Sequence, residues 1–254
     1  MGNIIFYFSG TGNSLMVAKT IAKELETVEI VSMAKSKKYT FTKQYDTIGF
    51  IFPTYYWGLP RAVMEFISNL DCNNKEAYYY TIATYGGIVG NSISQVKELL
   101  NEKNIVLNYG RKLRMVANYI IAYDISKRTD KILQRANNRL IPIILDIKNK
   151  KSNKIGKSNT LIKNFHEKSI KHISLIAKDF NVNNNCTGCE ICKEICPVKN
   201  IEIINKRPVF NDNCEQCIAC IQYCPKQAIN YKDKTQKRRR YTNPEIDYIE
   251  LTKY

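Results

Sequence analysis

Eight of the nine cysteines in this 254-residue chain lie between residues 186 and 224. They form two copies of one pattern, C-x2-C-x2-C-x3-C-P, at residues 186–197 and 214–225. Three thiolates spaced three residues apart on a tight loop can bind three corners of one iron–sulfur cube. The fourth cysteine, held at a turn by the following proline, points away toward another cube. The spacing therefore indicates two [4Fe-4S] clusters.

Two other uses of clustered cysteines fit this segment less well. A disulfide framework would need an oxidising compartment and a secretion signal, and the N-terminus lacks a basic segment followed by an apolar stretch and a cleavage site. Structural zinc usually uses paired C-x2-C units without a third cysteine at the same spacing or a closing proline. We therefore interpret the segment as an iron–sulfur module.

Residues 182–231 resemble a bacterial two-cluster ferredoxin over the whole module. In such proteins each [4Fe-4S] centre carries one electron at low potential. Cys72 stands apart, and we interpret it as a buried or incidental thiol because no histidine is near it in sequence. The cluster ligands are assigned as Cys186, Cys189, Cys192 and Cys224 for the first cluster, and as Cys214, Cys217, Cys220 and Cys196 for the second.

A second motif lies at the other end of the chain, where residues 8–14 read FSGTGNS. The apolar run from Ile4 to Phe8 predicts a buried parallel strand, and apolar residues at helical spacing follow the loop. Such a junction brings unpaired backbone amides and the positive end of a helix dipole together, which is a site for phosphate. The loop lacks the lysine of a triphosphate loop and the third glycine of a dinucleotide fingerprint. A single phosphomonoester, such as that of FMN, is expected.

The loop SGTGNS resembles the phosphate loop of flavodoxins. The resemblance implies an α/β fold with a doubly wound parallel sheet of order 2-1-3-4-5, an FMN cofactor, and two further flavin loops after the third and fourth strands. Residues 53–60, PTYYWGLP, and residues 84–87, TYGG, occupy those places. The residues predicted to bind the flavin are Ser9, Gly10, Thr11, Gly12, Asn13, Ser14, Pro53, Thr54, Tyr55, Tyr56, Trp57, Gly58, Thr84, Tyr85, Gly86 and Gly87.

The first flavin loop carries two further expectations. In the family, the peptide beside a glycine of this loop turns its carbonyl group toward the flavin on reduction, and Gly58 occupies that place. Flavodoxins usually place acidic residues around the flavin, whereas here Leu59 follows Gly58 and Arg61 is close by. We therefore expect the reduced flavin to be less destabilised than in a typical flavodoxin.

The remaining pattern alternates strands and helices. Strands are predicted near residues 3–8, 28–33, 46–52, 77–83 and 112–116, and helices from Asn13, over 60–70 and over 91–103. A further helix is predicted over 127–148, where Pro142 would cost about 3 kcal/mol or mark a kink. After a polar loop at 149–159, apolar residues from Ile162 to Phe180 predict another helix that runs into the cysteine module.

The chain carries a net charge of +16, and residues 124–180 alone hold 14 Lys and Arg against 5 Asp and Glu. This excess is either a solvated helical face, the more common case, or a docking surface for acidic redox partners such as small ferredoxins. The run Lys237 to Arg240 leaves the same two alternatives. No nucleic-acid-binding motif accompanies the charge. His166 and His172 are interpreted as surface residues.

Fusions of a flavodoxin-like half with a two-cluster ferredoxin half are a known family, which this chain resembles over nearly its full length. The expected domains are residues 1–180, flavodoxin-like with a basic helical extension at about 124–180, and residues 181–254, ferredoxin-like with a basic tail. No apolar run is long enough for a membrane helix, so a cytoplasmic protein is expected. The expected function is electron transfer between the clusters and FMN, which couples one-electron carriers to a flavin. Two alternatives are an FMN-dependent reductase of a small substrate and a non-catalytic binding protein.

Overall fold

The computed structural model describes residues 2–36, 39–71 and 73–253. The expectation for Cys72 therefore falls outside the described residues. Among the described helices, none is long and apolar enough to cross a membrane.

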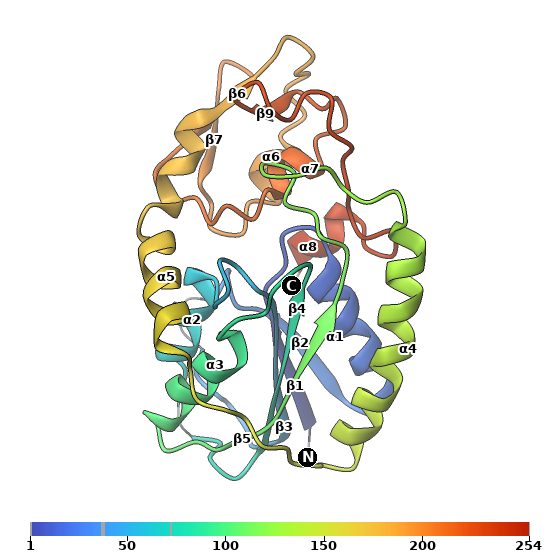
Figure 1. Cartoon of the computed structure of the whole chain (residues 1–254), viewed down its shortest axis with the longest axis vertical. Coiled ribbons are helices and arrows are strands. Elements are labelled where there is room, and N and C mark those ends of the chain that lie inside the picture. Colours follow the sequence, from blue (N-terminus) through green and yellow to red (C-terminus); the bar gives the residue numbers. More distant parts are fainter. Residues whose placement is uncertain (1, 37–38, 72, 254) are drawn as a thin grey trace.

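A parallel five-stranded sheet forms the centre of the N-terminal half (Figure 1). Its order is β2-β1-β3-β4-β5, so the expected order 2-1-3-4-5 is confirmed. The central strands are continuous apolar runs because both of their faces are buried. The strands are β1 (Gly2–Tyr7), β2 (Val28–Ser32), β3 (Tyr45–Pro53), β4 (Tyr78–Tyr85) and β5 (Leu107–Arg114).

The predicted position of the fifth strand was wrong. It was expected at residues 112–116, but β5 begins at Leu107. β5 lies at the edge of the sheet and alternates between buried and exposed residues over only part of its length. Asn108 and Gly110 interrupt the apolar pattern in its first half, which hides that half from a search for apolar runs.

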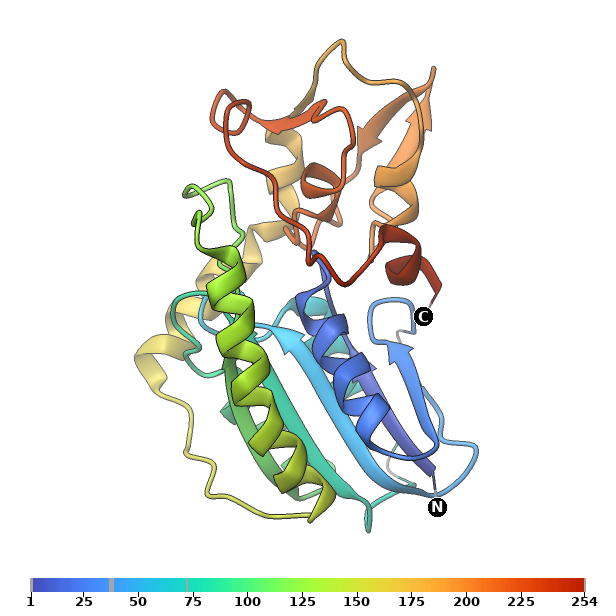
Figure 2. The ribbon, with the colours of Figure 1, turned by 90° about the vertical axis from the view of Figure 1, so that its right-hand side faces the viewer.

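Helices cover both faces of the sheet (Figures 1 and 2). Each face has its own apolar core, because alternate residues of a strand point to opposite sides. Helices α1 (Asn13–Glu24) and α4 (Thr129–Lys148) lie on one face. Helices α2 (Arg61–Ser68), α3 (Ser92–Asn101) and α5 (Thr160–Lys171) lie on the other.

The basic extension contributes to the fold instead of forming only a charged surface. Helix α4 buries a stripe of apolar residues that includes Leu140 and Ile144, while its charged residues face outward. The helix continues through Pro142, which is exposed, so water can solvate the carbonyl group that the proline leaves unpaired. Helix α5 ends at Lys171, and a 3-10 helix (Ile173–Asp179) follows, so the expected single helix is in fact two pieces.

The cysteine module sits over the carboxyl edge of the sheet (Figure 1). Its regular elements are short, and its apolar residues Ile218, Ile221 and Ile229 belong to the same core cluster as α1 and α4. The elements are α6 (Ile191–Glu194), α7 (Ala219–Gln222), and two antiparallel pairs, β6 (Phe180–Val182) with β9 (Ile229–Tyr231) and β7 (Ile201–Ile204) with β8 (Arg207–Phe210).

The C-terminal segment returns to the sheet domain. Its helix α8 (Tyr248–Lys253) lies beside α1 (Figure 2), and Glu250 pairs with Lys19. The backbone N–H of Asn243 donates to the carbonyl oxygen of Thr11 at 2.8 Å. Residues after the cysteine motifs thus fasten the loop that precedes α1.

Candidate functional site

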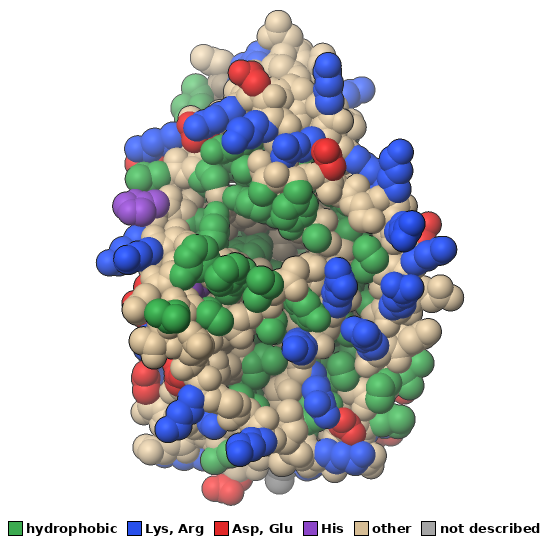
Figure 3. Space-filling model, in the orientation of Figure 1, with side chains coloured by type: hydrophobic (Ala, Val, Ile, Leu, Met, Phe, Trp, Pro, Cys, Tyr) green, Lys and Arg blue, Asp and Glu red, His purple; other side chains and the backbone are tan. Residues whose placement is uncertain are grey.

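A cavity of about 340 Å³ opens at the carboxyl edge of the sheet, below the cysteine module. In the space-filling view it is a hollow surrounded by hydrophobic side chains, with Lys and Arg farther out (Figure 3). None of the described residues that line it is charged. Of the predicted flavin-binding residues, those that line it are Ser9, Gly10, Thr11, Asn13, Ser14, Pro53, Thr54, Tyr55, Tyr56, Trp57, Thr84, Tyr85, Gly86 and Gly87.

The first wall of the cavity is the loop between β1 and α1. Gly12 precedes the helix with φ of 91°, a left-handed conformation that suits glycine, and no side chain caps the helix. The first helical hydrogen bond runs from the N–H of Met16 to the carbonyl oxygen of Gly12 at 2.9 Å. The N–H groups of residues 13–15 consequently have no acceptor within the helix and are available to an anion.

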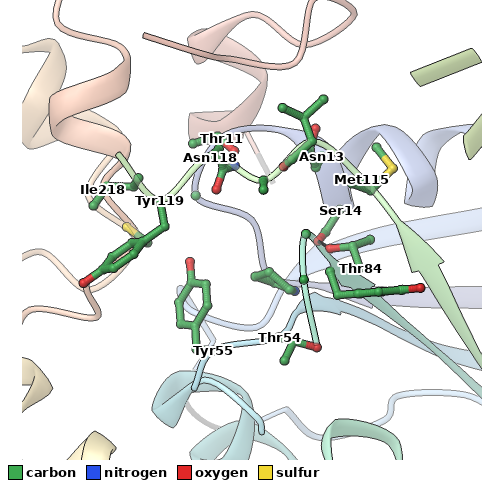
Figure 4. Close-up of a pocket in the computed structure, with 18 of the residues that line it drawn as sticks. Thr11, Asn13, Ser14, Thr54, Tyr55, Thr84, Met115, Asn118, Tyr119 and Ile218 are labelled. Carbon is green, nitrogen blue, oxygen red and sulfur yellow. Dashed lines mark hydrogen bonds between the residues drawn. The ribbon is translucent and has the colours of Figure 1, made fainter. Parts of the chain in front are cut away.

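A residue of this loop, Thr11, and a residue of the first turn of α1, Ser14, form hydrogen bonds to neighbouring segments (Figure 4). Ser14 Oγ and Thr84 Oγ1 are 2.9 Å apart and share a hydrogen bond, which joins the ends of β1 and β4. The side chain of Asn118 donates to Thr11 Oγ1. The hydroxyl groups predicted to face a phosphate are thus held in place by hydrogen bonds within the protein.

Asn13 is turned mainly toward the C-terminal segment. Its Oδ1 accepts hydrogen bonds from the hydroxyl group of Tyr241 at 2.7 Å and from Asn243 Nδ2 at 3.1 Å. Gly12, a predicted flavin-binding residue, does not line the cavity, because it packs against Ile246 of the same segment. A Cβ atom on Gly12 would lie 2.9 Å from Ile246 Cβ.

The second wall is a tight turn between Tyr55 and Gly58. Their backbone groups exchange two hydrogen bonds, of 3.0 and 2.9 Å. The two residues between them, Tyr56 and Trp57, have φ of 48° and 64°, which is a strained conformation for non-glycine residues. The ring of Trp57 packs against that of Phe165 of α5, with ring centres 4.6 Å apart and the planes tilted by 33°. The turn therefore presents its aromatic side chains to the cavity, while Gly58 does not line it.

His166 lies directly behind this turn, so the prediction of a surface residue was wrong. Its side chain is fully buried against Gly58, where a Cβ atom would lie 2.5 Å from the imidazole ring. The exposed His172 was predicted correctly. The periodicity of α5 gave no sign of this burial, because the space for the ring is created by a glycine about a hundred residues earlier in the chain.

The imidazole closes a ring of three hydrogen bonds. The N–H of Leu59 donates to Gln95 Oε1 at 2.9 Å, Gln95 Nε2 lies 3.1 Å from His166 Nδ1, and His166 Nε2 lies 2.9 Å from the carbonyl oxygen of Leu59. The amide of Gln95 donates to Nδ1, so the imidazole carries its proton on Nε2. Burial lowers the pKa of His166, and the Leu59 carbonyl opposes this shift only in part. The ring is therefore neutral at pH 7 and fastens the aromatic turn to α3 and α5.

A third part of the wall was missed by sequence reasoning. Residues 115–119, Tyr123 and Phe165 line the cavity, as do Gln216, Cys217 and Ile218 of the cysteine module. Residues 115–119 directly follow β5, so the rule that loops after parallel strands share one edge could have found them. Nothing local in the sequence places residues 216–218 there.

Hydrogen bonds join the two modules beside the cavity. The hydroxyl group of Tyr56 donates to Gln216 Oε1 and lies 3.3 Å from that of Tyr119. Arg61 pairs with Glu215 at 3.1 Å and donates to the carbonyl oxygen of Cys214 at 3.0 Å. Arg61 does not line the cavity, and it pairs with Glu215, whose pKa burial raises to about 7. Arg61 therefore gives no support to the expectation that the flavin is easily reduced. The remaining support is that none of the described residues lining the cavity carries a carboxylate.

None of the eight clustered cysteines forms a disulfide, and each lines one of two small cavities. Within the described part of the chain, no group of three or more His, Cys, Asp or Glu is placed to hold a single metal ion. Backbone N–H groups donate to three of the sulfur atoms, among them Cys196 Sγ from Asn200 at 3.1 Å. The first cavity contains Cys186, Cys189, Cys192 and Cys224, and the second contains Cys196, Cys214, Cys217 and Cys220.

The second cysteine cavity and the large cavity share a wall. Cys217 and Ile218 line both of them. On the other side of this wall Gly10 packs so closely that a Cβ atom would lie 2.5 Å from the carbonyl oxygen of Cys217. The phosphate-type loop and the cysteine loop are thus in direct contact.

The basic run from Lys237 to Arg240 was expected to be either a solvated surface or a docking surface, and two of its arginines make contacts within the molecule instead. Arg238 donates to the carbonyl oxygen of Ile120, and Arg239 Nη2 donates to Thr129 Oγ1 at 3.1 Å. These arginines join the end of the cysteine module to the segment before α4 and to the first residue of that helix. Part of the run is therefore engaged within the molecule.

Residues 4–106 match the family model of the flavodoxin domain. A search of curated proteins finds no match. Among solved structures, the chain is similar to a flavodoxin from the domain Archaea, with 18% identity over 58% of this chain and 99% of that one and a TM-score of 0.38. It is also similar to the two-electron reduced flavodoxin of Megasphaera elsdenii, with 21% identity over 43% of this chain and 84% of that one and a TM-score of 0.35. A third similar structure is the Trp repressor binding protein of Bacillus subtilis, with 13% identity over 57% of this chain and 98% of that one and a TM-score of 0.37.

The family match and the strand order confirm a flavodoxin-like sheet domain in the N-terminal part of the chain. The match ends at residue 106, well before the first clustered cysteine at residue 186. The resemblance of the cysteine module to a ferredoxin therefore stays a prediction.

Proposed function

We propose that this chain is an electron-transfer protein that binds FMN in the large cavity and two [4Fe-4S] clusters in the cysteine module. The observation that carries the proposal is that Cys217 and Ile218 line both the large cavity and the second cysteine cavity. Electron transfer needs donor and acceptor to be close, and a shared wall supplies that closeness without a diffusional encounter.

The chemistry of the large cavity supports FMN. Its first wall offers helix N-terminal amides and the hydroxyl groups of Ser9, Thr11 and Ser14, which suit one phosphate without a counter-ion. Its other walls offer the aromatic rings of Tyr55 and Tyr85, which can flank a flat ring system and exclude water. The family match over residues 4–106 supports the same assignment.

The chemistry of the two small cavities supports iron–sulfur clusters. Each cavity gathers four thiols, and the fourth cysteine of each motif lies with the first three of the other. Each thiol of a cube binds a different iron, so the four sulfur atoms surround a cluster, and no group of three has to converge on a single ion. The N–H groups directed at Cys196, Cys214 and Cys224 would stabilise the negative charge of bound thiolates.

When bound, the flavin would exchange one or two electrons and each cluster one. The protein would supply the arrangement: the second cluster beside the flavin, the first cluster farther away, and a partly exposed module surface at Cys189. Acidic redox proteins are the proposed partners, since the surface around the cavity is basic (Figure 3). We place the domain boundary near residue 180, with residues 241–253 returning to the sheet domain.

The alternative, a reductase of a small substrate, is less well supported. Reduction of most substrates needs a proton donor beside the flavin, and the described cavity wall contains no charged residue and no histidine. Its tyrosines are weak acids: burial raises the pKa of Tyr55 well above its usual value and raises that of Tyr119 as well.

The test is anaerobic reconstitution of the full chain, followed by counting flavin and iron and by stopped-flow reduction with a one-electron donor. We expect about one FMN and about eight irons per chain. A Cys214→Ser, Cys220→Ser variant should still bind FMN but reduce it much more slowly, because the second cluster is lost. Failure to bind FMN, an iron content near zero, or equal flavin reduction in both proteins would refute the proposal.

A further inference from the structure

Gln216 connects a proposed cluster ligand with the large cavity. Its backbone N–H donates to Cys214 Sγ at 3.2 Å, and its side chain lines the cavity. The residue is only 4% exposed, and its Oε1 accepts a hydrogen bond from the hydroxyl group of Tyr56. The amide nitrogen, Nε2, makes no hydrogen bond with another described residue. The wall of the cavity therefore contains a buried amide with a free donor, and buried donors in proteins usually have an acceptor.

The backbone of Gln216 has a conformation that favours glycine. Its φ is 53°, in the left-handed region where a residue with a side chain costs conformational free energy. At the same place in the first motif the residue is Gly188, with φ of 71°. Gly188 lines the first cysteine cavity, away from the large cavity, whereas Gln216 lines the large cavity. The glutamine thus occurs only in the motif that borders the proposed flavin site.

The loop of residues 214–218 contacts the sheet domain at several successive positions. The side chain of Arg61 pairs with Glu215 at 3.1 Å. Gly10 of the phosphate-type loop packs against the carbonyl oxygen of Cys217, and Cys217 itself lines both the large cavity and the second cysteine cavity. The loop that would bind the second cluster is therefore also part of the wall of the proposed flavin site.

We propose that the second cysteine motif completes the flavin site: Gln216 Nε2 donates a hydrogen bond to an oxygen or nitrogen acceptor of FMN, and the affinity for FMN depends on the second cluster. The inference rests on the proposed function, because it needs both cofactors. The ring system of a flavin carries carbonyl oxygens and ring nitrogens that accept hydrogen bonds, and the amide of Gln216 is an uncharged donor. The cluster acts by fixing the loop, because a loop that is already ordered costs less conformational entropy when FMN binds.

The coupling is reciprocal and concerns one cluster. By linkage, FMN stabilises the second cluster by the same factor by which the cluster strengthens FMN binding. The first cluster takes no part, since no described residue lines both its cavity and the large cavity. A chain that lacks only the second cluster keeps an incomplete flavin site of lower affinity.

The test is a titration of the anaerobically reconstituted, flavin-free full chain with FMN, followed by flavin fluorescence, with iron counted in each sample. Gln216→Gly should keep both clusters, because glycine suits the left-handed backbone and stands at this place in the first motif. Its Kd for FMN should rise about tenfold, since the amide donor is lost. The matched control is Gln227→Gly. Gln227 is exposed, has φ of 46° and does not line the cavity, so its Kd should change less than about twofold.

The role of the second cluster is tested by removing each cluster in turn. Cys214→Ser, Cys220→Ser should still bind FMN, but about tenfold more weakly than the wild type. Adding Gln216→Gly to that variant should change the Kd less than about twofold further, because both changes act through one loop. Cys186→Ser, Cys189→Ser removes the first cluster and should leave the Kd within about twofold of the wild type.

Unchanged FMN affinity in Gln216→Gly with about eight irons bound would overturn the proposal. An equal affinity with and without the second cluster, an equal fall after loss of either cluster, or fully additive losses in the combined variant would also overturn it. If Gln216→Gly loses its clusters, Tyr56→Phe decides. It removes the hydroxyl group that holds the amide and is not a cluster ligand, so an unchanged Kd would contradict the proposal. A wild-type chain that holds about eight irons but binds no FMN would instead refute the proposed function.

Discussion

The sheet domain and the cysteine module are stabilised by different means. Residues 2–114 form strands of five to nine residues with an apolar core on each face. Residues 180–231 contain only strands and helices of three or four residues, and seven of their non-glycine residues have positive φ. A chain with such short elements forms no sheet or helix layer large enough to bury an extensive core of its own. The sheet domain can therefore fold around its own side chains, whereas the proposed function predicts that the module depends on bound clusters for its stability.

The largest effect should follow from removing the iron of the two proposed clusters. We expect anaerobic chelation to lower the amide protection of residues 180–231 by about a hundredfold or more, because the module has little regular structure to fall back on. Strands β1, β3 and β4 should keep their protection. Hydrogen exchange followed by mass spectrometry measures both regions in one sample. Retained protection of residues 180–231 without iron would show that the module folds on its own contacts.

A substitution at the contact between the two regions should have the next largest effect. In Gly10→Val, the new side chain meets the carbonyl oxygen of Cys217, since even a Cβ atom would lie 2.5 Å away. We expect FMN affinity to fall about tenfold or more and the free energy of unfolding to fall by about 1–3 kcal/mol. Flavin fluorescence and thermal unfolding measure the two quantities.

Gly156→Ala is the matched control for Gly10→Val, because a Cβ atom there meets nothing within 4 Å. It should leave both quantities unchanged. If Gly10→Val bound FMN as tightly as the wild type, the contact between the phosphate-type loop and the cysteine loop would have no influence on the flavin site.

The sequence predicted those parts of the site that depend on local pattern. The apolar run from Ile4 to Phe8 and the glycines after it identify a buried strand and its loop, and parallel strands bring their following loops to one edge. The half-exposed edge strand β5 has a weaker pattern, so its start was misplaced. The grouping of the cysteines in two cavities also agrees with the sequence pattern. Three cysteines of each motif are spaced three residues apart on one short loop, and the fourth, before a proline, points toward the other group.

Contacts between distant segments could not be predicted in this way. Tyr56 and Gln216 are 160 residues apart, and no periodicity in either segment indicates that they meet. The side chain of Asn13 was expected at the phosphate, but two residues of the C-terminal segment bind it. In both cases the partner is determined by how the modules pack, which is a property of the whole chain.

A third prediction concerns the support of the aromatic turn. His166→Ala breaks the ring of hydrogen bonds with Leu59 and Gln95 and leaves a space beneath Gly58. We expect the free energy of unfolding to fall by about 2 kcal/mol and FMN affinity to fall about fivefold, since the turn loses its anchor. His172→Ala, on the exposed side of the same segment, should change neither. A flavin affinity equal in both variants would mean that the turn needs no such anchor.

The same residue gives a pH dependence of known sign. The pKa of His166 is lowered by burial from the ordinary value of 6.5, so the unfolded chain takes up a proton at a higher pH than the folded chain. The stability contributed by the neutral imidazole is complete above pH 6.5 and decreases as the pH falls toward the folded pKa. The stability difference between wild type and His166→Ala should therefore shrink between pH 7.5 and 5.5. A difference that stays constant over this range would contradict a buried neutral histidine.

The smallest effect should come from the C-terminal segment, which follows the cysteine module in the sequence but contacts the sheet domain. Tyr241→Phe removes the hydrogen bond to Asn13 Oδ1, while the bond from Asn243 remains. We expect a loss of about 1 kcal/mol in the free energy of unfolding and a change in FMN affinity of less than about twofold. Tyr248→Phe, in the same segment, is the control for removal of a hydroxyl group. If Tyr241→Phe weakened FMN binding as strongly as Gly10→Val, the C-terminal segment would have to be counted as part of the flavin site. The sheet domain and residues 216–218 would then need residues from the far end of the chain as well to bind FMN, and the division into two regions at residue 180 would not describe the site.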